Sequence, residues 1–149
     1  MIRGYTYDNT LLLKALGTAI TSSAASATII DTLNGATLNT GVEVPYWAAD
    51  AVIDVTAMDV ASTDELYTII IQLSASATFA SGVLNRAGLL LGNARAGSDD
   101  QTTGRYVLSF DNVLAETSYR YVRAYTLLGG GTSESITWKG FCGTRLGQW

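Results

Sequence analysis

The sequence predicts an all-β protein, a jelly-roll-like antiparallel β-sandwich of about eight strands with a short N-terminal arm or helix. Short runs rich in β-branched and aromatic residues recur along the chain, and turn-forming residues separate them. A chain of 149 residues is long enough for one domain with its own core. We expect the arm or helix over residues 1–20, the sandwich over residues 21–142 and a tail over residues 143–149.

The first predicted elements are short. A leucine-rich run after Asn9 and Thr10 predicts a short helix, capped by one of these two residues and closed near Gly17. A linker of small residues follows. Residues 27–33 then predict a strand, which ends at the turn dipeptide Asn34-Gly35.

The strand around which the fold is expected to form covers residues 65–76, the longest run rich in β-branched and aromatic residues. Alternation along a strand gives this run two faces. One face carries Tyr67, Ile69, Ile71 and Leu73, and the other carries Leu66, Thr68, Ile70 and Gln72. A solvated antiparallel sheet normally has a polar outer face. We therefore expect the second, half-apolar face to be covered by another element or another subunit.

The remaining strands are predicted from the same kind of pattern. Pro45 marks an edge or a bend, because proline cannot donate a hydrogen bond to a sheet. The glycines at 129–131 are expected to turn the last two strands into a hairpin. This spacing fits an all-β sandwich or barrel, and short strands with long connections favour a jelly roll over an immunoglobulin-like layout. The further strands are predicted over residues 51–58, 87–92, 105–110, 118–128 and 135–141.

Composition argues against several classes of partner. The net charge is −4, and the nine lysines and arginines are scattered along the chain, so neither nucleic acid nor an anionic membrane is an expected partner. The N-terminus lacks the pattern of a signal peptide, and no apolar run is long enough to cross a bilayer. We expect a soluble product made in a cytoplasm. Charged residues make up only 15% of the chain, and such a surface suits close protein contact.

Composition also limits the chemistry. The chain has no histidine and one cysteine, Cys142. An intrachain disulfide is therefore excluded, and so are Ser-His-Asp, Cys-His and zinc-site mechanisms. We expect Cys142 to be a small buried side chain near the end of a strand.

A few polar residues fit binding or catalysis only weakly. Asp99 and Asp100 lie in the most polar stretch and are calcium-type ligands, but too few others surround them, so a solvated loop is expected. The carboxylate pairs of Asp111 with Glu116 and of Asp54 with Asp59 have no recognisable glycosidase pattern around them. The glycines at 129–131 lack the lysine of a P-loop. We predict no catalytic residue, no metal and no cofactor, and a protein that is not an enzyme.

Three segments carry a resemblance to a known family. They are Tyr7-Asp8 with Leu11-Leu12-Leu13 and residues 25–31, the strand and small residues of 69–79, and the Arg-Tyr-x-Arg strand within 116–125. Over about residues 8–142 the chain resembles the capsid cement, or decoration, proteins of tailed bacteriophages, in particular their small jelly-roll type. The tail over residues 143–149 departs from the family pattern.

The resemblance implies a structural virion protein without a small-molecule substrate. It implies a jelly-roll homotrimer on the outside of a capsid, assembled in the host cytoplasm, bound to the major capsid protein and reinforcing its lattice. For the protein interface we select residues of the termini, one aromatic beside Pro45 and the second face of the central strand. These residues are Arg3, Tyr5, Tyr7, Trp47, Leu66, Ile70, Arg145 and Trp149.

A carbohydrate-binding jelly roll, such as an adhesion module, is the alternative function. It requires Trp47 or nearby tyrosines exposed side by side as stacking platforms. A calcium ion near Asp99 and Asp100 would fit the same function.

Overall fold

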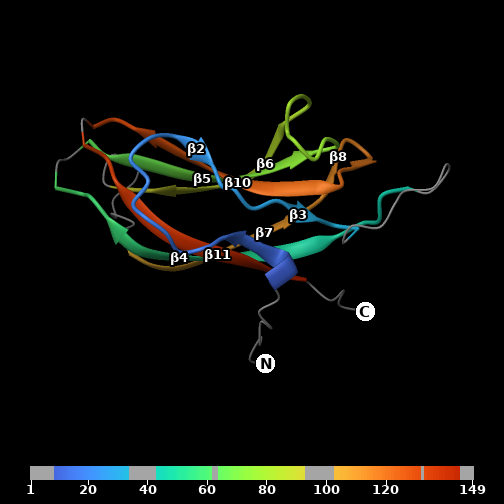
Figure 1. Cartoon of the computed structure of the whole chain (residues 1–149), viewed down its shortest axis with the longest axis horizontal. Helices are drawn as coiled ribbons and strands as arrows, with labels where there is room; N and C mark the ends of the chain where they lie inside the picture. Colours follow the sequence, from blue (N-terminus) through green and yellow to red (C-terminus); the bar gives the residue numbers. More distant parts are fainter. Residues whose placement is uncertain (1–8, 34–42, 62–63, 93–102, 132, 145–149) are drawn as a thin grey trace.

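A computed structural model describes residues 9–33, 43–61, 64–92, 103–131 and 133–144. In these residues the chain forms two antiparallel sheets that pack face to face as a β-sandwich (Figure 1). The predicted all-β class is confirmed. The elements, in chain order, are η1 (Asn9–Leu11), β1 (Leu12–Lys14), β2 (Ala24–Ala25), β3 (Ile30–Asp31), β4 (Ala48–Met58), β5 (Leu66–Ser74), β6 (Leu84–Leu91), β7 (Gly104–Asp111), β8 (Val113–Leu114), β9 (Thr117–Ser118), β10 (Tyr121–Gly129) and β11 (Ile136–Thr144).

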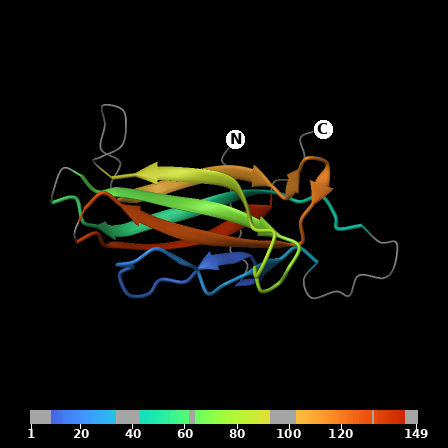
Figure 2. The ribbon, with the colours of Figure 1, turned by 90° about the horizontal axis from the view of Figure 1, so that it is seen from above.

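The strand order is that of a jelly roll. Sheet A has the order β1-β11-β4-β7 and sheet B the order β2-β10-β5-β6, with β3 paired to β10 beside β2 (Figure 2). The pairs are nested along the sequence, because β1 pairs with β11, β2 with β10, β4 with β7 and β5 with β6. Over the described residues the two sheets contain nine strands, because β2 and β3 share one edge of β10, and this agrees with the jelly-roll-like sandwich of about eight strands expected from the sequence. The short strands β8 and β9 form a separate hairpin.

The predicted N-terminal helix is wrong. Asn9–Leu11 forms a single 3-10 turn, and the next three residues form the edge strand β1 of sheet A. Leu13 is fully buried in the core, and Leu12 pairs with Phe141 of β11. A run of this length does not make a self-supporting helix, whereas the edge of an existing sheet supplies backbone partners and burial.

The predicted hairpin of the last two strands is also wrong. β10 lies in sheet B and β11 in sheet A, so the glycine run passes from one sheet to the other. Gly130 has a φ of +97°, and a Cβ there would collide with the carbonyl oxygen of Asp64. Each strand has an apolar face, and these two faces pack against each other across the core. The strands are not paired edge to edge within one sheet. Trp138 of β11 donates a hydrogen bond to Thr126 of β10 across the core, over 3.0 Å.

The other strand predictions hold with shifted ends. Five of them match β4, β5, β7, β10 and β11 within a few residues, and β6 begins at Leu84, before the predicted start. The strand predicted over residues 27–33 is reduced to β3, while Ala24–Ala25 forms β2. Between the two, both the backbone N–H and the hydroxyl of Ser26 donate to the carbonyl of Ala124 on β10. The Ser26 side chain therefore supplies a hydrogen bond to β10 at a point where the regular backbone ladder is interrupted.

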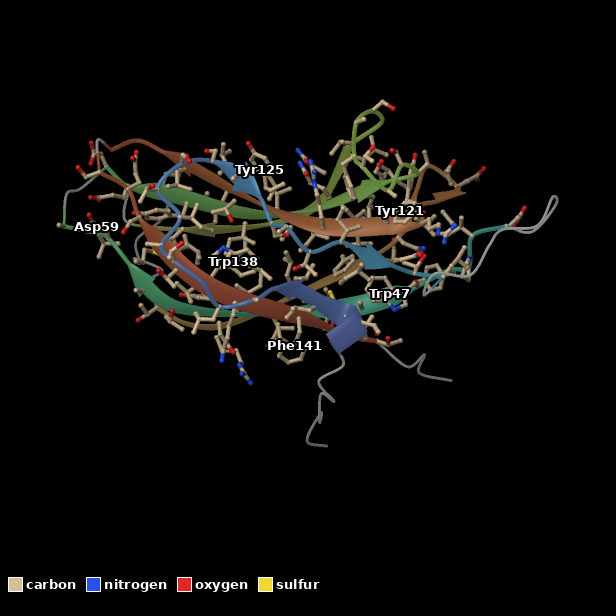
Figure 3. The ribbon with its side chains drawn as sticks, in the orientation of Figure 1. Trp47, Asp59, Tyr121, Tyr125, Trp138 and Phe141 are labelled. Carbon is tan, nitrogen blue, oxygen red and sulfur yellow. The ribbon has the colours of Figure 1, made fainter. Side chains whose placement is uncertain are left out.

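The core lies between the two sheets. On β5 the predicted inner face is confirmed, because Tyr67, Ile69, Ile71 and Leu73 are fully buried. Trp138 is the largest buried side chain opposite them, and Figure 3 shows it between the sheets. Cys142 is buried as expected, and burial raises the pKa of its thiol, with a further contribution from the charge of Asp50.

Candidate interaction surface

The outer face of sheet B carries the half-apolar side of the central strand. The register places Tyr125 of β10 beside Ile70, and Leu127 of β10 and Leu90 of β6 on either side of Thr68. Leu66 completes the row at the start of β5. We call the six residues Leu66, Thr68, Ile70, Leu90, Tyr125 and Leu127 the sheet B patch. It runs across three neighbouring strands and is formed by residues that point away from the core.

The sheet B patch is open in the single chain. Leu127 and Leu90 are 44% and 40% exposed, and Leu66 and Ile70 are half-buried. Neither of the last two packs against the core cluster. Gly88 and Gly129 pair with Ile70 and Leu66, so no side chain flanks either residue on that side. The result is a low, apolar strip on the outside of the sheet.

The other half of this face is polar and is covered by the chain itself. Gln72, the fourth residue of the second face, accepts a hydrogen bond of 2.9 Å from Arg123 and donates one of 3.0 Å to Asn85. Phe79, in the loop between β5 and β6, lies 4.3 Å from the Arg123 guanidinium and is 6% exposed. The loop that carries Phe79 is thus the covering element expected for the second face of β5, but it covers only the end near Gln72 and Arg123. The sheet B patch has no such cover in the described part of the single chain.

Phe79 adopts an unusual backbone conformation to reach this position. Its φ is +53°, in the left-handed region that non-glycine residues rarely occupy. The backbone N–H of Phe79 donates to the carbonyl of Ser76, and the hydroxyl of Ser74 accepts from the N–H of Ser76. These hydrogen bonds form a tight turn at the end of β5, and the turn directs the ring toward Arg123.

Trp47 lies at the other end of the sandwich from the β4–β5 turn, at which Figure 3 labels Asp59. Its indole nitrogen donates to the Thr144 hydroxyl over 3.2 Å, and its backbone N–H donates to the Asn112 side chain over 2.7 Å. Its ring meets Phe110 edge to face at 5.6 Å. Trp47 therefore fastens the start of β4 to the ends of β7 and β11, and it is not brought together with Leu66 and Ile70.

Five of the predicted interface residues lie outside the described part of the chain. They are Arg3, Tyr5, Tyr7, Arg145 and Trp149. Asp99 and Asp100, the weak candidates for calcium, also lie outside it. Leu66 and Ile70 are the two predicted interface residues that the fold brings to one surface.

One carboxylate of each pair considered for catalysis is held by an arginine. Asp54 accepts hydrogen bonds of 2.6 and 2.8 Å from Arg105, and these bonds hold the pKa of its carboxyl below the ordinary value. Asp111 pairs with Arg86 at 3.1 Å. A general acid of a glycosidase needs a raised pKa, which is the opposite of what Arg105 imposes on Asp54. Among the residues described, no group of three or more acidic, histidine or cysteine side chains is placed to hold a metal ion.

Sequence reasoning found the part of the sheet B patch that lies on β5, but missed the residues that β6 and β10 contribute. Alternation along a strand at residues 118–128 puts Tyr125 on one of its two faces, but no sequence signal pairs it with Ile70. Leu90 and Leu127 come from strands that meet β5 only in the folded chain. The contact between Phe79 and Arg123 likewise joins residues that are far apart in sequence.

No helix in the described ranges combines the length and the apolar character needed to span a membrane. No protein-family model matches the chain, and no curated protein matches it in sequence.

Proposed function

We propose that the protein is a cement, or decoration, protein that binds the outside of a tailed-bacteriophage capsid and reinforces the lattice of the major capsid protein. The observation that carries this proposal is the sheet B patch, an apolar strip open in the single chain on a surface that is otherwise weakly charged. The three sequence segments that resemble cement proteins support it, and the jelly-roll topology agrees with the small type of that family.

The energetics of the sheet B patch favour a protein partner. Fully burying one leucine or isoleucine side chain contributes about 1.5–3 kcal/mol, and Leu90 and Leu127 each have part of this contribution left to gain. Contiguous exposed apolar surface of this kind marks sites of protein contact. Repeated seating on a lattice would add weak contacts together through effective concentration. We also propose that the protein forms a homotrimer, in which part of the sheet B patch is buried between copies.

The carbohydrate-binding alternative gains no support from Trp47. A stacking platform needs an exposed aromatic face, whereas the ring of Trp47 packs against Phe110 and its nitrogen is bonded to Thr144. Tyr46 is exposed, but Trp47 does not lie open beside it as a second platform, and we therefore propose the capsid role alone.

The direct test is to locate the protein in virions of the phage that encodes it. Immunogold labelling of purified particles with an antibody raised against the chain is expected to decorate the outside of the heads. Heads assembled without the gene are expected to release DNA at a lower temperature than heads that carry the protein. Absence of the protein from purified heads, or its location in the tail alone, would contradict the proposal.

A pair of variants tests the role of the sheet B patch. Leu90→Lys places a charge in the patch, and Val107→Lys is the matched control, because Val107 is 50% exposed on β7, an edge strand of the other sheet. We expect L90K to lose binding to heads prepared without the protein, while V107K binds like the wild type in a co-sedimentation assay. Equal binding of the two variants would show that the patch is not the surface used.

A further inference from the structure

The outer face of sheet A contains a groove on the opposite side of the sandwich from the sheet B patch. It has a volume of about 410 Å³ and lies along β1, where this short edge strand meets β11. Apolar side chains line one part of it. Phe141 is half-buried and points outward from sheet A in Figure 3, Leu12 pairs with it, and Leu16 is 57% exposed on the segment that follows β1.

Charged side chains line the rest of the groove. The register places Lys139, Asp54 and Arg105 in one row across β11, β4 and β7. Arg105 uses Nε and Nη2 to bind both oxygens of Asp54, which leaves its Nη1 without an acceptor among the described residues. Lys139 is exposed and forms no hydrogen bond or ion pair with the residues that the structure describes.

Lys14 closes the end of the groove near β1. Its ammonium donates to the carbonyl oxygens of Trp138 and Ala15, over 3.0 and 3.1 Å, and lies 5.5 Å from the centre of the Trp138 ring. Burial lowers the pKa of this amine. Three basic side chains and one carboxylate therefore surround the groove, and Asp54 is already neutralised by Arg105. This local excess of positive charge stands in a chain whose net charge is −4.

We propose that this groove binds an extended segment of another protein that places a carboxylate beside an apolar side chain. The carboxylate pairs with Lys139 and the open edge of Arg105, and the apolar side chain lies against Leu12 and Leu16. The volume falls within the range of about 300–1,000 Å³ that is usual for binding sites. Charge complementarity selects an acidic segment and rejects a basic one.

A peptide fits these groups better than a nucleic acid does. Phosphate binding draws on many clustered cations, whereas this groove offers few and includes the carboxylate of Asp54. An apolar surface beside an exposed ammonium suits a segment in which acidic and apolar residues alternate, because an extended chain presents them to neighbouring subsites.

The test uses the purified full-length protein and a defined probe. The probe is the peptide acetyl-Asp-Leu-Asp-Phe-amide, and its uncharged analogue acetyl-Asn-Leu-Asn-Phe-amide is the control. In a nuclear magnetic resonance titration to about 2 mM peptide, a range that detects dissociation constants near 1 mM, we expect shifts confined to the groove. The amides expected to move are those of β1, of Asp54 and Arg105, and of residues 139–141. The analogue is expected to produce at most a fifth of the effect.

A charge-matched pair of variants locates the contact. Lys139→Gln lowers the net charge by one, and so does Thr117→Glu on the separate β8–β9 hairpin. We expect K139Q to weaken binding of the acidic peptide about fivefold, as the loss of one ion pair predicts, and T117E to leave it unchanged. Equal weakening by both variants would overturn the proposal, because it would indicate a response to net charge alone.

Three other results would also overturn it. They are the absence of any shift at the highest peptide concentration, shifts centred on the sheet B patch, and stronger binding of an eight-residue oligothymidine than of the acidic peptide. Because the groove and the patch lie on opposite faces, failure here leaves the capsid proposal standing. Failure of the virion test leaves the groove proposal standing in the same way.

Discussion

The indole nitrogen of Trp138 on β11 donates a hydrogen bond of 3.0 Å to the hydroxyl oxygen of Thr126 on β10. Both residues are buried, and they belong to different sheets. The indole N–H has no water available, so Thr126 supplies the acceptor that such a buried donor needs. This contact joins the two sheets inside the core, and the Tyr67 hydroxyl of β5 joins them again at one end through hydrogen bonds with the backbone of Asp59 and Ser135.

Thr126→Val is expected to destabilise the protein because it keeps the shape of the side chain but removes the acceptor. A buried donor left unsatisfied costs about 1–3 kcal/mol, measured as the loss in free energy of unfolding by urea titration. The matched control is Thr137→Val, on the outward side of β11, which should change stability by less than about 0.5 kcal/mol. Equal effects would mean that the Trp138 bond adds nothing.

Gly140→Ala is expected to destabilise the core through crowding. A Cβ at this position would lie 2.9 Å from Cζ3 of Trp138 and 3.1 Å from the carbonyl oxygen of Val52, so the indole ring must move. Overpacking of this kind costs about 1–3 kcal/mol. At Gly17 no atom lies within 4 Å of the same addition, and G17A should therefore be neutral or slightly stabilising. Thermal unfolding of both variants compares the two sites, and a stable G140A would contradict the packing described.

The Asp54–Arg105 pair is expected to contribute a small stability that depends on pH. The folded-state pKa of Asp54 is lowered, so its contribution is present above about pH 4, the unfolded value, and is lost as the pH falls through the folded value. The pair is partly exposed, so Asp54→Asn should cost only about 0.2–1 kcal/mol at pH 7, less in high salt. Unfolding of wild type and D54N between pH 7 and pH 2 measures this difference.

The control for that series is Glu116→Gln, at an exposed carboxylate on the β8–β9 turn without a described ion pair. At pH 7, E116Q is expected to change the free energy of unfolding by less than about 0.5 kcal/mol, as substitutions on an exposed surface usually do. A D54N difference that grows as the pH falls would have the wrong sign and would contradict the lowered pKa.

Cys142 is expected to react with thiol reagents only when the protein unfolds. The side chain has no exposed surface, and its raised pKa leaves little thiolate at neutral pH. For a domain of ordinary stability, modification by a disulfide reagent should be slower than in guanidinium chloride by about a thousandfold or more. Rapid modification of the native protein would show that the end of β11 opens locally.

The strands were predictable from the sequence, but their partners were not. Alternation gave the inner face of β5, from Tyr67 to Leu73, because a buried face repeats every second residue. The same kind of pattern gave the strands β10 and β11, yet the hairpin expected between them is absent. A short glycine-rich connection fits a turn within one sheet and a crossing between two sheets alike, and no local pattern announces the contact of Trp138 with Thr126 across the core.

The candidate surfaces show the same limit. Leu66 and Ile70 were found because they share one strand with the core residues, so a single pattern contained them. Their neighbours Leu90 and Leu127 depend on strand register, and the covering of Arg123 by Phe79 depends on an unusual turn. The groove of sheet A combines residues of β1, β4, β7 and β11, and no local pattern connects Lys139 with Arg105.

The nested pairing of the strands sets the moment during synthesis at which the molecule can close. Sheet A needs β11 between β1 and β4, so it stays divided until residue 144 has emerged from the ribosome. Sheet B, by contrast, is complete once β10 is available. When β10 has been translated, the nascent chain can therefore hold a finished sheet B with only the β4–β7 part of sheet A to cover its inner, apolar side, and β11 completes that cover.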